Sequence, residues 1–527
     1  MQMDKFCTYY LLAVMSGGVF LTSRHFINIE NDIKFYTILL FSILLLIICS
    51  LHPRGLEHLH SSIRSVPFYW GLSLLSLTMA IQGLAQYVGL SDSLHVSCPI
   101  TGSFENTAGY IAVQNLLLPF SLYLFFNEGD QKRLRIIPLV SVILTSLSII
   151  LSESRCGVLA MLAVILVMTV VEKKISLKFR HYKLTWALGV FILILLAYIL
   201  YHLKKDSADG RLFIWTVCLE LIKEKPIIGH GINGFQSQYM DYQANYFISH
   251  PESKYAMLAD NIIHPFSEWL KITVNFGFVG LSVVGMSIYK LCKKLRKTEG
   301  NSTSIGLSIV ASMIVLCSFS YPFHYAPACF LALFPLLYII PLYSINAFSK
   351  FGYIRFIFPL ILCIVIGIVS RMAFLDLKWA EICKRSLAGK TEQMLPNYAS
   401  MIPEMRHNPL FLYNYSAELN FSGHYKESQQ IINECLKLYN DYDVQILIAN
   451  NYENMGQWEA ALHTYQNASN MIPCRFVPLY DMLQIYQQIG DTVKADSIAQ
   501  TILNKPIKIP SSSIDKMKAE TEKWATN

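Results

Sequence analysis

The amino-acid sequence predicts an all-α membrane protein that crosses the bilayer about eleven times. Of its 527 residues, 53% are hydrophobic and only 15% are charged, and the mean hydropathy of +0.39 exceeds that of ordinary soluble proteins. The apolar residues are gathered in runs of roughly 15 to 22, close to the length that a helix needs to cross a hydrocarbon core of about 30 Å. The runs lie at 6–23, 35–51, 66–90, 109–126, 136–152, 156–171, 184–203, 272–289, 305–320, 325–343 and 356–375.

The distribution of basic residues predicts the orientation of these spans, because lysine and arginine collect in cytoplasmic loops. With the N-terminus inside, eighteen of them fall in cytoplasmic segments, and the short outer loops carry only Arg24, Lys34 and Arg155. We therefore expect a large outer loop at about 204–268 and an outer C-terminal segment. The net charge of +7 follows from this asymmetry, so no nucleic-acid partner is expected.

The composition changes after residue 375, where a period of 33 to 34 residues appears. Gly423, Gly456 and Gly490 mark this period. The middle unit has Trp458, Ala461, Tyr465 and other residues where a tetratricopeptide repeat places its packing side chains. The sequence therefore predicts two domains, a membrane domain at 1–375 and a repeat domain at 376–527 that forms an α-solenoid and offers a surface for a protein partner or a glycan.

Arg155 is the first candidate functional residue. Glu153 and Arg155 occupy a turn of only a few residues between two apolar runs. Many such arginines only extend their charge to the membrane surface. An ionisable group at this depth is nevertheless a candidate for binding or catalysis.

The outer loop supplies a second arginine and a glycine motif. Asp209 is expected to cap a helix whose first turn carries Arg211, where a positive charge is unfavourable to the helix and therefore suggests a ligand. The following "GHGING" fits the dinucleotide pattern G-x-G-x-x-G, but no strand precedes it, so we expect a tight turn at 229–234.

The end of the loop supplies candidate bases. Asp260, His264 and Glu268 recur every four residues and would share one face if this segment were helical. No spacing typical of a metal site occurs here, so no metal ion or other cofactor is expected.

Five segments together resemble the O-antigen ligase and polymerase family over about residues 80 to 345. They are "TGSFENTAGYIAVQNLLLP" (101–119), "SRCGVLAML" (154–162), "GRLFIWTVCLELIKEKPIIGHGINGF" (210–235), "SEWLKITVNFGFVGL" (267–281) and "SYPFHYAP" (320–327). The resemblance implies a metal-independent enzyme of the bacterial inner membrane. Such an enzyme transfers a glycan from an undecaprenyl-diphosphate carrier to an acceptor on the periplasmic side.

The resemblance also implies roles for the candidate residues. Arg155 and Arg211 match the family's two diphosphate-binding arginines, and guanidinium groups suit that ligand because they bind phosphate oxygens in a fork. The family's histidine position, counted back from Gly277 and Gly280, falls at Phe266. The catalytic base is therefore open between His264 and Glu268. We expect all these side chains to converge on one cavity at the outer membrane face.

Several activities fit this sequence. The acceptor could be a lipid, another carrier-linked glycan or a protein hydroxyl, which correspond to a ligase, a polymerase or a protein O-oligosaccharyltransferase. A non-catalytic membrane scaffold or glycan exporter, which uses its repeats for docking, is the alternative from another class.

Overall fold

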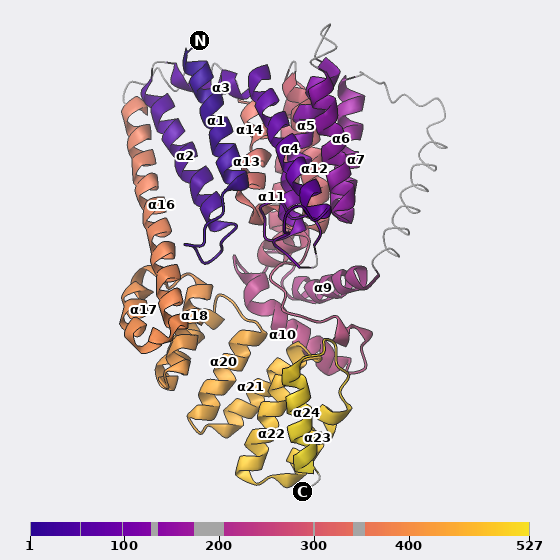
Figure 1. Ribbon diagram of the computed structural model, residues 1–527, viewed down its shortest axis with the longest axis vertical. Helices are drawn as coiled ribbons and strands as arrows, with labels where there is room; N and C mark the ends of the chain where they lie inside the picture. Colours follow the sequence, from indigo (N-terminus) through magenta and orange to yellow (C-terminus); the bar gives the residue numbers. More distant parts are fainter. Residues whose placement is uncertain are drawn as a thin grey trace, which may run out of the picture. The chain divides into compact units, whose positions relative to one another are not determined.

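A computed structural model describes residues 2–52, 54–96, 98–127, 135–172, 205–298, 301–340 and 354–525. These residues form helices joined by turns, with no strand among them, which confirms the all-α class (Figure 1). Their contacts divide the chain into two units. The membrane unit comprises Met1–Leu193, Phe266–Glu268 and Val283–Ala380, and the loop–repeat unit comprises Ile194–Pro265, Trp269–Ser282 and Glu381–Asn527.

The membrane unit is built from long apolar helices. In chain order they are α1 (Gln2–Phe20), α2 (Asp32–Leu51), α3 (Gly55–Ile63), α4 (Val66–Tyr87), α5 (Thr107–Asn127), α6 (Ile136–Leu151), α7 (Arg155–Glu172), α11 (Glu268–Leu295), α12 (Asn301–Phe319), η2 (Pro322–His324), α13 (Ala326–Ala332), α14 (Phe334–Tyr338) and α16 (Ile354–Arg385). Helices α11 and α16 also contribute residues to the loop–repeat unit.

Seven of the described helices are long and apolar enough to cross a membrane. They coincide with the expected spans at 35–51, 66–90, 109–126, 156–171, 272–289, 305–320 and 356–375. The runs at 136–152 and 325–343 coincide with shorter apolar helices, and the run at 6–23 coincides with α1. The expected span at 184–203 lies outside the described residues, so the total of eleven stays a prediction.

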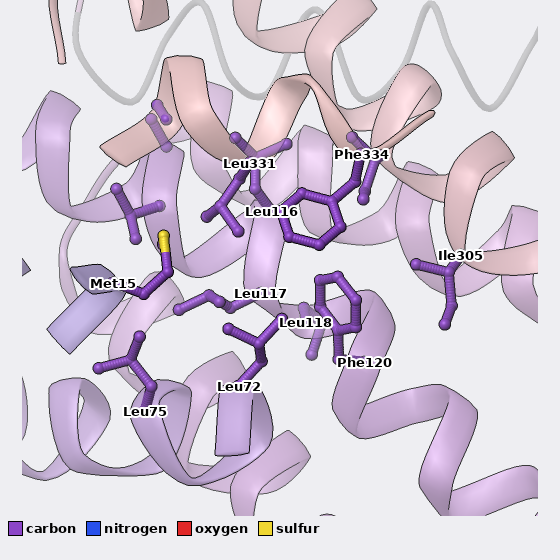
Figure 2. Packing of buried hydrophobic residues seen from close by; sticks show 14 of the residues in the cluster. Met15, Leu72, Leu75, Leu116, Leu117, Leu118, Phe120, Ile305, Leu331 and Phe334 are labelled. Atoms are coloured by element: carbon purple, nitrogen blue, oxygen red, sulfur yellow. The ribbon is translucent and has the colours of Figure 1, made fainter. Parts of the chain in front are cut away.

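Helix α5 forms the centre of the membrane unit. Most of its residues are buried, as expected of a helix surrounded by others, and it packs against α4, α6, α7, α12 and α13. Figure 2 shows Leu116, Leu117, Leu118 and Phe120 of α5 among side chains from neighbouring helices, including Phe334 of α14.

Buried hydroxyl and amide groups link α4, α5 and α6. The Ser76 hydroxyl donates to Gln114 Oε1 (2.8 Å) and lies 2.9 Å from Thr145 Oγ1, and Tyr110 donates to Ser148 (2.9 Å). Small polar residues let membrane helices approach closely and satisfy their hydrogen bonds between helices. These bonds therefore fix the register of the three helices.

The loop–repeat unit contains the loop that the sequence predicts at 204–268 and the C-terminal helices. The loop forms α9 (Lys205–Glu224), α10 (Gly234–Ser249) and η1 (Lys254–Met257). After α16 come η3 (Ser386–Lys390), α17 (Thr391–Met405), α18 (Pro409–Phe421), α19 (Tyr425–Leu436), α20 (Tyr442–Asn454), α21 (Trp458–Met471), α22 (Val477–Ile489), α23 (Thr492–Asn504) and α24 (Ser512–Ala525).

Three helix pairs follow the period read from the sequence: α18 with α19, α20 with α21, and α22 with α23. Gly423, Gly456 and Gly490 lie in the turns within the pairs with φ of +80°, +70° and +76°, a conformation that glycine adopts without steric cost. Ala461 and Tyr465 are buried, as predicted. The assignment of these pairs to tetratricopeptide repeats stays a prediction.

Candidate functional site

Arg155 is the first residue of α7 and follows a tight turn. Glu153 has a positive φ of 56°, and the Ser154 hydroxyl accepts a hydrogen bond from the backbone N–H of Gly157 (3.2 Å). Ser154 therefore caps the helix. The predicted short turn between two apolar helices is confirmed, because α6 ends at Leu151.

Glu268 lies in the same unit as Arg155. It is the first residue of α11 and only 7% exposed. Cys317 of α12 lies within electrostatic range of both Glu268 and Cys156, the residue that follows Arg155. Helix α12 also packs along α7. Glu268 and Arg155, the acidic and the basic candidate of the membrane unit, therefore both belong to helices that lie beside α12.

The structure corrects the local setting of Arg211. The described part of α9 begins at Lys205, so Asp209 is a buried residue within the helix and does not cap it. Arg211 is the seventh residue of α9, beyond the first turn where the helix dipole opposes a positive charge most strongly. The argument from an unfavourable helix start is therefore wrong for this residue.

A hydrogen bond joins the helix of Arg211 to the segment of His264. The indole N–H of Trp215 donates to the carbonyl oxygen of Pro265 (3.0 Å). Arg211 lies four residues before Trp215 and so shares its face of α9. His264 directly precedes Pro265 in the chain. The loop therefore brings Arg211 and His264 to the same side of α9 within the loop–repeat unit.

The expectation that Asp260, His264 and Glu268 share a helical face is wrong, because α11 begins only at Glu268 and residues 258–267 form no helix. Asp260 instead contacts the C-terminal helical region. Its carboxylate accepts a hydrogen bond from Arg475 (3.1 Å) and lies 3.7 Å from the Lys508 ammonium. Asp260 is therefore a structural residue rather than a third member of the site.

Asn261 continues this contact. Its side-chain amide donates to Asp443 (2.9 Å) and accepts from the backbone N–H of Tyr442 (3.1 Å). We call Asp260, Asn261, Tyr442, Asp443, Arg475 and Lys508 the loop clasp. The segment of His264 is thus held at 260–261 by the C-terminal helical region and at Pro265 by α9.

The "GHGING" segment is a tight turn, as the sequence predicts. Gly229 and Gly231 have positive φ, and the backbone N–H groups of His230 and Gly231 donate to the carbonyls of Val274 and Asn275 (both 2.9 Å). The turn therefore packs directly on α11, whose own helix is interrupted at Gly277 (φ 62°, ψ −165°).

Sequence reasoning missed a polar cluster in the membrane unit. His324 lies 3.2 Å from Glu105, and Glu105 also accepts a hydrogen bond from Asn28 (3.4 Å). Burial acts to raise the pKa of Glu105, but hydrogen bonds from His324, Asn28 and Asn31 and the charge of His324 lower it overall. The available signal was a histidine inside the apolar "SYPFHYAP" segment.

The candidate residues therefore fall into two groups. Arg155 and Glu268 belong to the membrane unit, and Arg211 and His264 belong to the loop–repeat unit. Within the described residues, no group of three or more His, Cys, Asp or Glu side chains is arranged to hold a metal ion.

Comparisons with known proteins point to one family. Residues 140–285, which include all four candidates, match the family model described as O-antigen ligase. The chain is 30% identical over 122 residues to a "Putative polysaccharide ligase" of Rickettsia conorii, which covers 23% of this chain and 28% of the relative. Proteins of the same name from Rickettsia typhi and Rickettsia bellii are 34% identical over 95 and 96 residues. The chain spans only 22% of the length of each of these two.

Proposed function

The chain carries a domain of the O-antigen ligase family, and on this premise we propose that it transfers a glycan from an undecaprenyl-diphosphate carrier to an acceptor. The transfer takes place at the periplasmic face of the bacterial inner membrane. The observation that supports it most is the Trp215–Pro265 hydrogen bond, because it joins the helix that carries Arg211 to the segment that carries His264, both inside the matched residues.

The proposed chemistry is a displacement at the anomeric carbon of the carrier-linked sugar. An acceptor hydroxyl forms a new bond to this carbon while the bond from the carbon to the diphosphate oxygen breaks, which inverts the configuration. The hydroxyl proton passes to His264 or Glu268. Arg155 and Arg211 bind the departing lipid diphosphate and stabilise the negative charge that develops on it.

Substitution of the arginines tests this assignment. Removal of one donor that stabilises developing charge typically lowers the rate about 100- to 1,000-fold, so Arg155→Ala and Arg211→Ala should lose transfer at normal protein levels. Arg155→Lys should also fail, because an ammonium keeps the charge but loses the fork. Lys223→Ala is the matched control, since Lys223 lies on α9, is exposed and pairs with Glu220.

Two further variants separate the candidate bases. Whichever of His264→Ala and Glu268→Gln abolishes transfer while donor binding is kept identifies the base. Full activity of both variants would refute a base at either position.

Gene deletion tests the function itself. Loss of the protein should make the carrier-linked glycan accumulate and should remove the finished product. The product that disappears, whether lipid-bound, lengthened or protein-bound glycan, identifies a ligase, a polymerase or a protein O-oligosaccharyltransferase.

The alternative is a non-catalytic scaffold or glycan exporter that binds a protein partner through its C-terminal helices. Such a protein would tolerate Arg155→Ala and Arg211→Ala together. Wild-type glycan transfer by that double variant would therefore favour the scaffold over the enzyme.

A further inference from the structure

The membrane unit contains a cavity of about 590 Å³ between α1, α2, α3, η2, α13 and α14. On α2 it is lined by a stripe of residues at helical spacing, namely Phe35, Ile38, Leu39, Ser42, Leu45 and Leu46. From Asp32 to Leu46 this stripe rises about 21 Å, or roughly two thirds of a hydrocarbon core of about 30 Å. The cavity therefore has the length and lining that suit a hydrocarbon chain.

The polar residues of the lining are concentrated at one end of the cavity. Asn28, Asn31, Asp32 and His324 lie there, while the remaining lining is apolar apart from Ser42 and Cys329. A chain with a polar head therefore fits in one direction only, with its head beside the start of α2 and its tail toward Leu59 and Leu337.

The charge at the polar end determines which head group fits. Among the residues that the structure describes, the lining contains no lysine or arginine, and Asp32 is joined there by Glu105, which is held by His324 and Asn28. Lys34 is a nearby cation, but its ammonium donates to the carbonyls of Glu30 and Ser103 (both 2.6 Å). A diphosphate would therefore face the carboxylates of Asp32 and Glu105 beside His324, whose positive charge is already paired with Glu105, which makes this a poor site for the proposed glycan donor.

Hydroxyl groups match the same end well. Carboxylates accept hydrogen bonds from them, amide groups both donate and accept, and an imidazole nitrogen can do either. We propose that this cavity, which we call the α2 groove, binds the chain of a lipid whose head group is uncharged and rich in hydroxyls. This binding proposal does not depend on the proposed transfer reaction.

Photolabelling of the full-length protein in phosphatidylcholine nanodiscs tests the proposal. Two probes carry the same alkyl chain with a diazirine group, one as a glucoside and one as a diphosphate. Mass spectrometry then counts labels on the peptides of α2, α13 and α14. We expect about tenfold more labelling of the groove by the glucoside, a ratio that corresponds to about 1.4 kcal/mol. Equal or stronger labelling by the diphosphate would overturn the proposed head-group chemistry.

Two matched variants show whether the label comes from the groove. Ser42→Phe places a ring in the lining and should reduce labelling about tenfold. Leu44→Phe adds a ring on the same helix at a residue that is 39% exposed and outside the lining, and should leave labelling unchanged. Equal labelling of both variants would show that the probe reacts from the surrounding bilayer and would refute the site.

A variant that reverses the charge at the polar end tests the role of the Asp32 carboxylate. Asp32→Lys should reverse the preference in favour of the diphosphate probe, whereas an unchanged preference would contradict the role of the carboxylate. The comparison of the two probes in the unchanged protein needs no variant, so the proposal can be refuted even if Asp32→Lys does not fold.

Discussion

Gly277→Ala is the substitution whose effect follows most directly from the geometry. Gly277 has φ 62° and ψ −165°, a region that is essentially restricted to glycine and costs another residue about 1–3 kcal/mol. A Cβ atom at this position would also lie 2.1 Å from the carbonyl oxygen of Ile227, a backbone atom that cannot rotate away.

The crowded backbone is itself held by hydrogen bonds. The N–H groups of Phe278 and Val279 donate to the carbonyls of Pro226 (2.8 Å) and Ile227 (3.2 Å). If this backbone segment moves aside, the two hydrogen bonds break, and each contributes about 0.5–1.5 kcal/mol to the stability. Together with the backbone strain, Gly277→Ala should destabilise the protein by about 2–6 kcal/mol.

The measurement is thermal unfolding of the full-length protein in detergent, followed by intrinsic fluorescence. Gly285→Ala is the matched control on α11, since its Cβ would meet no atom within 4 Å. Alanine is favoured over glycine in a helix interior by about 0.5–1 kcal/mol, so this variant should melt at or slightly above the wild-type temperature. If Gly277→Ala has the same melting temperature as Gly285→Ala, the reasoning from backbone geometry is wrong.

Three further predictions concern the loop–repeat unit. Burial and the charge of Glu453 raise the pKa of Asp481 from its usual 3.8 to about 7, so the folded state binds this proton more tightly and its stability falls as pH rises from about 4 to 7. Asp481→Asn should melt at a higher temperature than wild type at pH 8 and at the same temperature as wild type at pH 4. A difference in melting temperature that is the same at both pH values would contradict the raised pKa. In the loop clasp, Arg475→Ala removes half-exposed contacts worth about 0.2–1 kcal/mol, whereas Asn261→Ala loses two hydrogen bonds worth about 1–3 kcal/mol. Hydrogen exchange of 259–265 should therefore rise more in Asn261→Ala, and the reverse order would refute the clasp as described. Reporter fusions after Lys225 and after Gly423 should both give a periplasmic signal, and a cytoplasmic signal from either would overturn the proposed orientation.

Much of the fold could be predicted because its signals are local. A run of apolar residues long enough to span the bilayer forms a helix there, since no other local structure satisfies its backbone hydrogen bonds in lipid. Helix α5 illustrates this, because the apolar run at 109–126 predicts a span and the structure has a helix at Thr107–Asn127. The glycines at 423, 456 and 490 likewise mark their turns, because each adopts a positive φ.

The site was predicted less completely. Residue types and order pointed to Arg155, Arg211, His264 and Glu268, but local reasoning misplaced the start of α9 and joined Asp260 to a helical face that does not form. Helix boundaries depend on tertiary contacts as well as on capping residues, so Asp209 resembles a cap in the sequence although it lies inside the helix.

The sequence by itself determined the helical class, the apolar spans that the described helices match, and the chemistry available to the candidate residues. Only the tertiary structure decided which distant groups meet: Trp215 with Pro265, Asp260 with Arg475, and Glu105 with His324. The last two pairs are separated by 215 and 219 positions along the chain. Such contacts arise from the packing of whole helices, and no periodicity within a single segment encodes them.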